Sequence, residues 1–459
     1  MRKMGWMTCL MVLAAAWAGA AAPGVEAWLS SEDGEFALTR VQAPRFEPVE
    51  RIAKEAVVVD AGRTYQSILG LGASLEHATC YNIARLPEDQ RAAVVERLVD
   101  PDTGIGMNLM RLCIGTSDFA PQPYYTYDDL PEGATDPELE QFSIEKDRAY
   151  LLPVIRLALR KNPDLRFFAS PWSPPGWMKS TGKLGGGRML DEHFAPYARY
   201  FARYIAAYRE EGVPVHAVTV QNEPHMVHPG YPTCLWRAEQ QRDFIRDHLG
   251  PELRRAGLDT RIWCWDHNWN EVAFPKTVLS DAQAAQYVDG TGFHLYEGKV
   301  EAQTVLHEAF PEKHIYFTEG STFRTRGAIE IIDILRNWAR SYNAWVILLD
   351  HERQPNSGPH HASPTCIMLR EDGSLDYRYD YYMYGQFMKF IPRGAVRIGT
   401  PDCGRRFAHI AFRTPDERIV LVVANADREA RAFKVAWKKT AFSTSLPARA
   451  VGTYRWTMD

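Results

Sequence analysis

This chain lacks a large excess of one charge, and it lacks any C-x-x-C motif. Its 459 residues hold 53 Lys and Arg against 57 Asp and Glu, a net charge of −4, which argues against nucleic acid or an anionic membrane as a partner. The seven cysteines form no C-x-x-C pair, so they provide no metal-binding or redox motif, and their pairing stays open. No internal repeat or low-complexity tract is present. These absences leave an ordinary globular protein.

The N-terminus carries one apolar run of signal-peptide length. Arg2 and Lys3 precede this run, and small residues follow at 18–22. This layout predicts a signal peptide over residues 1–22, and hence a secreted or periplasmic protein. A membrane anchor is the weaker interpretation, because the apolar core is short for a bilayer span.

From residue 67 onward, short apolar runs alternate with amphipathic segments. Apolar residues recur at three- and four-residue intervals in the segments 88–99, 147–161, 194–212, 238–257 and 329–342, which predicts helices. The apolar runs, read as strands, are 67–74, 107–115, 165–170, 216–224, 261–266, 290–297, 314–321 and 343–350. Eight strands alternating with helices or long connections predict a (β/α)₈ TIM barrel over residues 67–390.

The two ends of the chain have a different pattern. Residues 391–459 contain short strand-like segments with turns between them and no helical periodicity, and residues 27–66 are also extended and rich in turns. We therefore expect a small β-sandwich domain built from both segments, with the barrel inserted between them.

Two glutamates stand where strands of the predicted barrel end. Glu223 follows Asn222 at the end of the fourth strand, and Glu319 ends the seventh. Reactive side chains of a TIM barrel come from the C-terminal ends of its strands, so both carboxylates should face one mouth. Such a pair, one protonated and one ionised, is what glycoside hydrolysis requires.

The stretch SPWSPPGWMKS at 170–180 predicts a stiff loop. Its prolines exclude a helix and restrict the backbone, so they hold Trp172 and Trp177 in set directions. Together with Trp345, Trp172 is suited to packing against the apolar face of a sugar. Taken singly, Trp172 or His294 is as well explained as a core residue, and Arg111 as a structural ion pair. The combination with two glutamates favours a sugar site.

Several longer stretches carry a family resemblance through nearly the whole chain. They include GLGASLEHATCYN (70–82), ASPWSPPGWMKSTG (169–182), AVTVQNEPHMVHPGYPTC (217–234), GFHLY (292–296), TEGS (318–321) and YGQFMKFIPRGAVRI (384–398). With these segments the sequence resembles glycoside hydrolase family 30, the family of glucosylceramidases and β-1,6-glucanases. The resemblance implies a TIM barrel with an attached β-sandwich, and a retaining double displacement.

The resemblance also implies a role for each matching residue. Glu223 is expected to be the general acid/base and Glu319 the nucleophile, with Asn222 at the sugar 2-hydroxyl. No metal or organic cofactor is expected, and the histidines at 351, 360 and 361 are interpreted as loop residues. The remaining residues are expected to line the sugar subsite or to support the carboxylates: Trp172, Trp345, Arg111, His294 and Tyr296.

Two departures from the family pattern leave the exact sugar open. The expected carboxylate after the first strand is replaced by Glu76 or His77, between which the sequence does not decide, and no second tryptophan follows Trp345 closely. Asp350, His351 or Asn356 are candidates for that wall. A β-glucoside substrate, in a glycolipid or a β-1,6-glucan, is favoured. The alternatives are a β-xylosidase, β-fucosidase or xylanase, and a non-catalytic carbohydrate-binding protein. Exo or endo action and the oligomeric state stay open.

Overall fold

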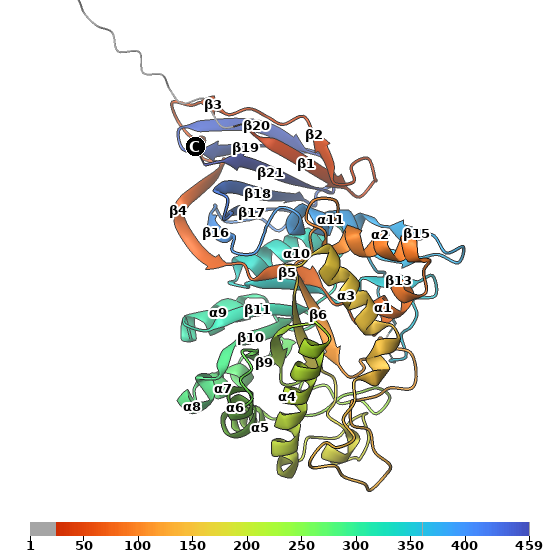
Figure 1. Cartoon of the computed structure of the whole chain (residues 1–459). Coiled ribbons are helices and arrows are strands. Elements are labelled where there is room, and N and C mark those ends of the chain that lie inside the picture. The colour runs from red at the N-terminus through yellow and green to blue at the C-terminus, as the bar shows by residue number, and fades with distance from the viewer. Residues whose placement is uncertain (1–23, 360, 459) are drawn as a thin grey trace, which may run out of the picture.

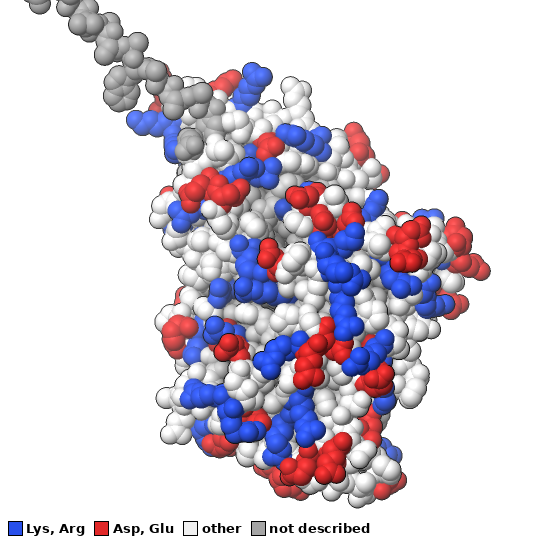
Figure 2. Space-filling view, viewed as in Figure 1, with Lys and Arg blue, Asp and Glu red and all other residues white. Residues whose placement is uncertain are grey.

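The computed structural model describes residues 24–359 and 361–458, so the predicted signal peptide lies outside the described residues. A β-sandwich stands at one end and a barrel with its helices forms the rest (Figure 1). Within the described ranges, no helix is long and apolar enough to cross a membrane, and the six cysteines are free. Figure 2 shows acidic and basic side chains interspersed over the face in view.

Parallel strands form a closed barrel. Six of them form one sheet in the order β11-β10-β9-β8-β7-β6, and β12 pairs with β5. Parallel bridges between Ser74 and Arg111 and between Ile315 and Ala339 join the two groups. The strands are β5 (Gly70–Ala73), β6 (Leu109–Ile114), β7 (Arg166–Pro171), β8 (Val215–Thr219), β9 (Arg261–Asn268), β10 (Val288–His294), β11 (His314–Glu319) and β12 (Ser341–Ala344). The predicted (β/α)₈ fold class is confirmed.

The helices lie on the predicted amphipathic segments, although α10 begins and ends earlier than the predicted 329–342. Helix α2 begins and ends where the periodicity does, and the predicted helix at 238–257 is a continuous run of α5, a π-helical turn over Ile245–Leu249, and α6. The helices are α1 (His77–Ala84), α2 (Glu88–Val99), α3 (Leu151–Lys161), α4 (Phe194–Glu210), α5 (Ala238–Phe244), α6 (Gly250–Arg255), α7 (Ala273–Leu279), α8 (Ala282–Ala285), α9 (Glu301–Ala309), α10 (Arg324–Arg336) and α11 (Tyr379–Met388).

The eighth barrel strand is shorter than the sequence predicts. Helix α10 ends at Arg336 rather than near 342, and β12 ends at Ala344. Val346 then adopts a φ of 59°, a left-handed conformation that a β-branched residue rarely takes and that interrupts the strand. The rest of the apolar run, Leu348–Asp350, forms β13 in a small separate sheet with β14 (Ile367–Leu369) and β15 (Leu375–Tyr377).

Strands from both ends of the chain form one ten-stranded sheet that folds into the sandwich. Strand β4 belongs to both layers, because Val57–Val59 pair with β19 and Asp60 to Ser67 pair with β16; its curvature is visible in Figure 1. The strands are β1 (Glu26–Ser31), β2 (Thr39–Val41), β3 (Glu47–Pro48), β4 (Val57–Ser67), β16 (Val396–Gly399), β17 (Phe407–Arg413), β18 (Arg418–Asn425), β19 (Arg431–Trp437), β20 (Thr440–Leu446) and β21 (Ala450–Thr457).

Candidate active site

Glu223 and Glu319 meet at the mouth of the barrel. Glu319 is the last residue of β11, and Glu223 lies just after β8 with a φ of 49°, held by its backbone N–H, which donates to the Asp266 carbonyl at 3.0 Å. One carboxylate oxygen of each glutamate lies within 4.8 Å of the other. Glu319 is buried and Glu223 is partly exposed. The two predicted carboxylates therefore share one site.

Each carboxylate oxygen of Glu319 receives one donor. The Arg111 guanidinium donates to Oε2, and the Tyr296 hydroxyl donates to Oε1 at 2.8 Å. Burial of the hydroxyl, with the neighbouring Glu319 charge, raises the pKa of Tyr296 well above its usual value. Tyr296 therefore stays protonated and keeps donating over the whole physiological pH range, which holds the Glu319 carboxylate in one orientation.

Arg111 connects the glutamate to the barrel interior. It is fully buried, and its Nη2 donates to Asn222 Oδ1 and to Asp266 Oδ2, both at 2.8 Å. Burial alone would lower the pKa of Arg111, but the charges of Asp266 and Glu319 hold it above its ordinary value. Because Oδ1 of Asn222 is already an acceptor, its amide N–H₂ is the group left to donate to a sugar hydroxyl.

Asp266 is a central residue that the sequence reasoning missed. Its carboxylate accepts from Arg111, from His294 Nε2 at 3.0 Å and from the hydroxyls of Ser170, Thr219 and Thr318 at 2.6–2.8 Å. Burial would raise the pKa of Asp266, yet Arg111 and His294 hold it well below its usual range. Its place at the end of a predicted strand, like the two glutamates, was the available signal.

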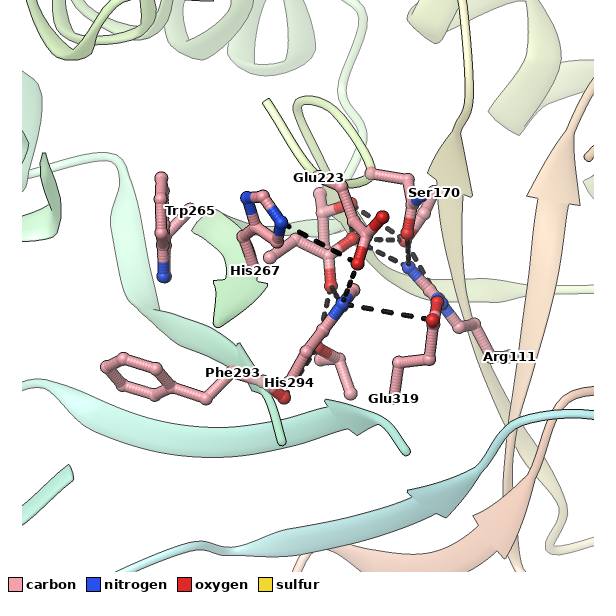
Figure 3. Close-up of polar contacts among 12 residues, drawn as sticks. Arg111, Ser170, Glu223, Trp265, His267, Phe293, His294 and Glu319 are labelled. Carbon is pink, nitrogen blue, oxygen red and sulfur yellow. Dashed lines mark hydrogen bonds and ion pairs between the residues drawn. The ribbon is translucent and has the colours of Figure 1, made fainter. Parts of the chain in front are cut away.

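Two histidines, His267 and His294, flank Glu223 (Figure 3), and their pKa values are shifted in opposite directions. His294 Nδ1 lies 3.2 Å from Glu223 Oε1 and its Nε2 contacts Asp266; burial opposes the charge, but the carboxylates Glu319, Asp266 and Glu223 raise the pKa of His294 to about 9. His267 Nε2 lies 3.6 Å from the same oxygen, and burial together with the His294 charge lowers the pKa of His267 to about 3. At neutral pH, His294 is thus an imidazolium and His267 a neutral ring.

The two predicted tryptophans stack on each other. The rings of Trp172 and Trp345 lie 5.0 Å apart at 24°, and the Arg111 guanidinium lies 4.7 Å from the Trp172 ring. Trp172 is 3% exposed and Trp345 is 9% exposed, so Trp345 presents more surface to a ligand. Trp177 lies elsewhere: its Nε1 donates to Asp128 at 2.9 Å, beside a separate surface cavity. The stiff loop therefore brings one of its indoles to this site.

Neither Glu76 nor His77 reaches the cleft, contrary to expectation. Both side chains are completely buried. Glu76 caps helix α1 by accepting from the Thr79 N–H and hydroxyl, and His77 Nε2 contacts the Tyr125 hydroxyl at 3.0 Å. Burial raises the pKa of Glu76 to about 8 and lowers that of His77 to about 3, so both are neutral at pH 7. Glu76 and His77 therefore stabilise the folded loop and helix α1.

Asp118, in the loop after β6, is a further carboxylate that interacts with both glutamates. Burial, followed by the charges of Glu319 and Glu223, raises its pKa to about 7. It is part-exposed, and its backbone carbonyl accepts from the Ser357 N–H at 2.9 Å. Asp350, by contrast, caps a turn by accepting from the Glu352 and Gln354 N–H groups.

The atoms of Glu223, His294 and Glu319 lie close enough together to hold a metal ion. A histidine ligand must offer an unprotonated nitrogen. Here both ring nitrogens of His294 face carboxylates, and the carboxylates keep its pKa near 9. At neutral pH His294 is therefore an imidazolium between the two glutamates, which fits acid–base chemistry better than metal binding.

Family models match both parts of this architecture. The TIM-barrel domain of glycosyl hydrolase family 30 matches residues 68–391, and the β-sandwich domain of the same family matches residues 394–454. The chain belongs to glycosyl hydrolase family 30. It is thus a glycoside hydrolase, and the predicted family and enzyme class are confirmed.

Named members of family 30 with similar sequences act on two kinds of glucoside. An endo-1,6-β-D-glucanase of Neurospora crassa is 35% identical over 402 residues, 82% of each chain. Mouse lysosomal acid glucosylceramidase is 30% identical over 433 residues, 86% of this chain and 82% of the mouse protein. Among solved structures, an endo-β-1,6-glucanase superposes with a TM-score of 0.87 and 27% identity, covering 95% of this chain and all of its own.

Proposed function

We propose that this family 30 enzyme is an exported, retaining β-glycosidase that hydrolyses β-glucosidic bonds of a β-1,6-glucan or a glucosylceramide-like glycolipid. The observation that carries the mechanism is the separation of the two glutamates, whose nearest carboxylate oxygens approach within 4.8 Å. Retaining enzymes hold their carboxyl groups about 5–5.5 Å apart, whereas inverting enzymes keep them about 6.5–9.5 Å apart to admit a water.

In the first half-reaction, Glu319 attacks the anomeric carbon and Glu223 protonates the departing glycosidic oxygen. Arg111 and Tyr296 orient the two oxygens of Glu319 for this attack. The bond from the anomeric carbon to the aglycone breaks, and a covalent glycosyl-ester forms on Glu319. Asn222, through its amide N–H₂, donates to a hydroxyl beside the reacting carbon.

In the second half-reaction, Glu223 acts as a base. It removes a proton from a water molecule, which attacks the anomeric carbon and releases Glu319 as a carboxylate. His294, an imidazolium close to both glutamates, compensates the negative charge that alternates between them. The product keeps the β configuration because two displacements each invert the carbon.

The glucosyl preference is supported by the relatives, which are an endo-1,6-β-D-glucanase and a glucosylceramidase. Asp118, whose pKa responds to the charges of both glutamates, is the side chain expected to accept from hydroxyls of the bound sugar. Its hydrogen bonds would discriminate between sugars by the position of their hydroxyl groups.

A panel of aryl glycosides tests the proposal. The mature protein should hydrolyse an aryl β-glucoside in preference to the β-xyloside, β-fucoside and α-glucoside, and Glu319→Gln should abolish this activity without unfolding the protein. Glu223→Ala should retain activity on an activated aryl glucoside, which needs little protonation, and lose it on an alkyl glucoside. If Glu223→Ala lost activity equally on the aryl and the alkyl glucoside, the acid/base assignment would be wrong.

Export is proposed from the N-terminal segment alone, whose basic residues Arg2 and Lys3 precede an apolar run. N-terminal sequencing of the protein recovered from the medium or periplasm tests it. Cleavage near residue 22 is the expected result, and an uncleaved cytoplasmic chain would contradict export.

A further inference from the structure

Strand β9 is irregular at the end that enters the active site. Gly292 of β10 pairs with Trp265, and the next residue, Phe293, pairs with His267, so Asp266 is an extra residue in the ladder. Trp265 and Asp266 have φ values of 70° and 66°. Consecutive left-handed residues that are not glycine are costly, and such strain is concentrated at functional sites.

The bulge changes where two neighbouring side chains point. In a regular strand, successive side chains face opposite sides of the sheet. Here Asp266 reaches Arg111 inside the barrel, and His267, the next residue, reaches Glu223 at the mouth. The strained backbone thus delivers both an acid and an imidazole to one site, and Figure 3 shows the imidazole, His267, beside Glu223.

The contacts of the His267 ring indicate which nitrogen carries its proton. Its Nδ1 is buried and has no hydrogen-bond partner among the described residues, whereas Nε2 lies 3.6 Å from Glu223 Oε1, slightly beyond hydrogen-bond length. A buried N–H without an acceptor is more costly than a bare lone pair, so the neutral ring carries its proton on Nε2. His294 Nδ1 points at the same oxygen from 3.2 Å.

We propose that His267 is a positioning residue for the acid/base glutamate: the N–H groups of His267 and His294 converge on Oε1 of Glu223, so that Oε2 alone holds the proton given to the leaving group. This inference rests on the proposed function of Glu223. Oε1 is an acceptor in both half-reactions, and the proton leaves Oε2 for the glycosidic oxygen and returns to Oε2 from water. The carboxyl group therefore does not rotate between the two steps.

The test compares leaving groups in His267 variants. His267→Phe keeps a ring against Trp265 but removes the donor, and it should lower kcat/KM for an alkyl β-glucoside about tenfold while leaving that for a dinitrophenyl β-glucoside within about twofold. His267→Gln, which keeps an N–H donor, should lose less on the alkyl substrate, with the same selectivity, and it tests the proposal even if the Phe variant does not fold. His225→Phe is the matched control, since the His225 ring packs near the His267 ring and contacts Trp265 and Phe274.

The outcomes separate this inference from the function on which it rests. A selective loss on the alkyl glucoside in His267→Phe, smaller in His267→Gln and absent in His225→Phe, supports the positioning role. Equal losses on both substrates, or no loss on either, would overturn it. A wild-type protein that hydrolyses neither β-glucoside would refute the proposed function instead.

Discussion

At the scale of single residues, two carboxylic acids have raised pKa values but different roles. Asp118 is part-exposed and interacts electrostatically with Glu223 and Glu319, whereas Glu76 is fully enclosed against Thr79. Asp118→Ala should lower kcat/KM for a β-glucoside roughly thirtyfold, since a hydrogen bond to a charged group contributes about 2 kcal/mol. Steady-state kinetics measures this effect, and Glu76→Gln is the control that should keep wild-type activity.

The pH dependence of stability tests the raised pKa of Glu76. Burial raises the pKa of Glu76 from 4.5 to about 8, so the folded protein binds this proton more tightly than the unfolded chain. Its stabilising contribution is complete below pH 4.5 and is lost as the pH rises through about 8. Urea unfolding from pH 5 to 9 should therefore show Glu76→Gln gaining stability relative to wild type with rising pH. A constant difference would contradict the raised pKa.

At the scale of elements, the end of β9 holds the charge network together. Removing the Asp266 charge leaves Arg111 and His294 buried beside a neutral amide, and breaking a buried ion pair in this way costs about 3–5 kcal/mol. Asp266→Asn should thus lower the free energy of unfolding by that amount and lower the pKa of His294 from about 9. Urea melts and an NMR titration measure these two effects. Unchanged values of both would contradict the network, and the exposed Asp402→Asn is the control.

How well the sequence predicted an element depended on whether local pattern decided it. Strand β6, buried along its whole length, and helix α2, with its apolar stripe, have clear periodicities and were predicted well. The end of β12 was predicted wrongly. The left-handed backbone of Val346 ends the strand but leaves the apolar pattern of the sequence unbroken. The bulge at Asp266 and the inward turn of Glu76 were missed for the same reason: side-chain direction in a loop or bulge is set by tertiary contacts.

At the scale of the whole molecule, the sandwich and the barrel share chain and contacts. Strand β4 runs through both sandwich layers and leads directly into β5. On the barrel side, Gln386 Nε2 in α11 donates to Ser30 Oγ, and Thr453 donates to Gln386 in turn. These buried bonds tie the two domains, so calorimetry should show one unfolding transition for the intact protein. Two well-separated transitions would contradict this coupling.

The charge composition of the whole chain limits the class of substrate but does not identify it. The near-balanced charge seen over one face in Figure 2 fits an uncharged substrate but does not name one. The paired glutamates at Asn222-Glu223 and Thr318-Glu319 were recognisable because barrel topology places strand ends together. The identity of the sugar was not recognisable, because the proposed sugar ligand Asp118 lies in a loop whose path no local pattern reveals.

The configuration of the first product tests most directly whether Glu223 and Glu319 carry out a double displacement. Proton NMR during hydrolysis of an aryl β-glucoside resolves the anomeric signals before mutarotation mixes them. With a double displacement, β-glucose should appear first, and the α-glucose signal should grow slowly through mutarotation. Initial release of α-glucose would show inversion and contradict the assignment of Glu319 as the nucleophile.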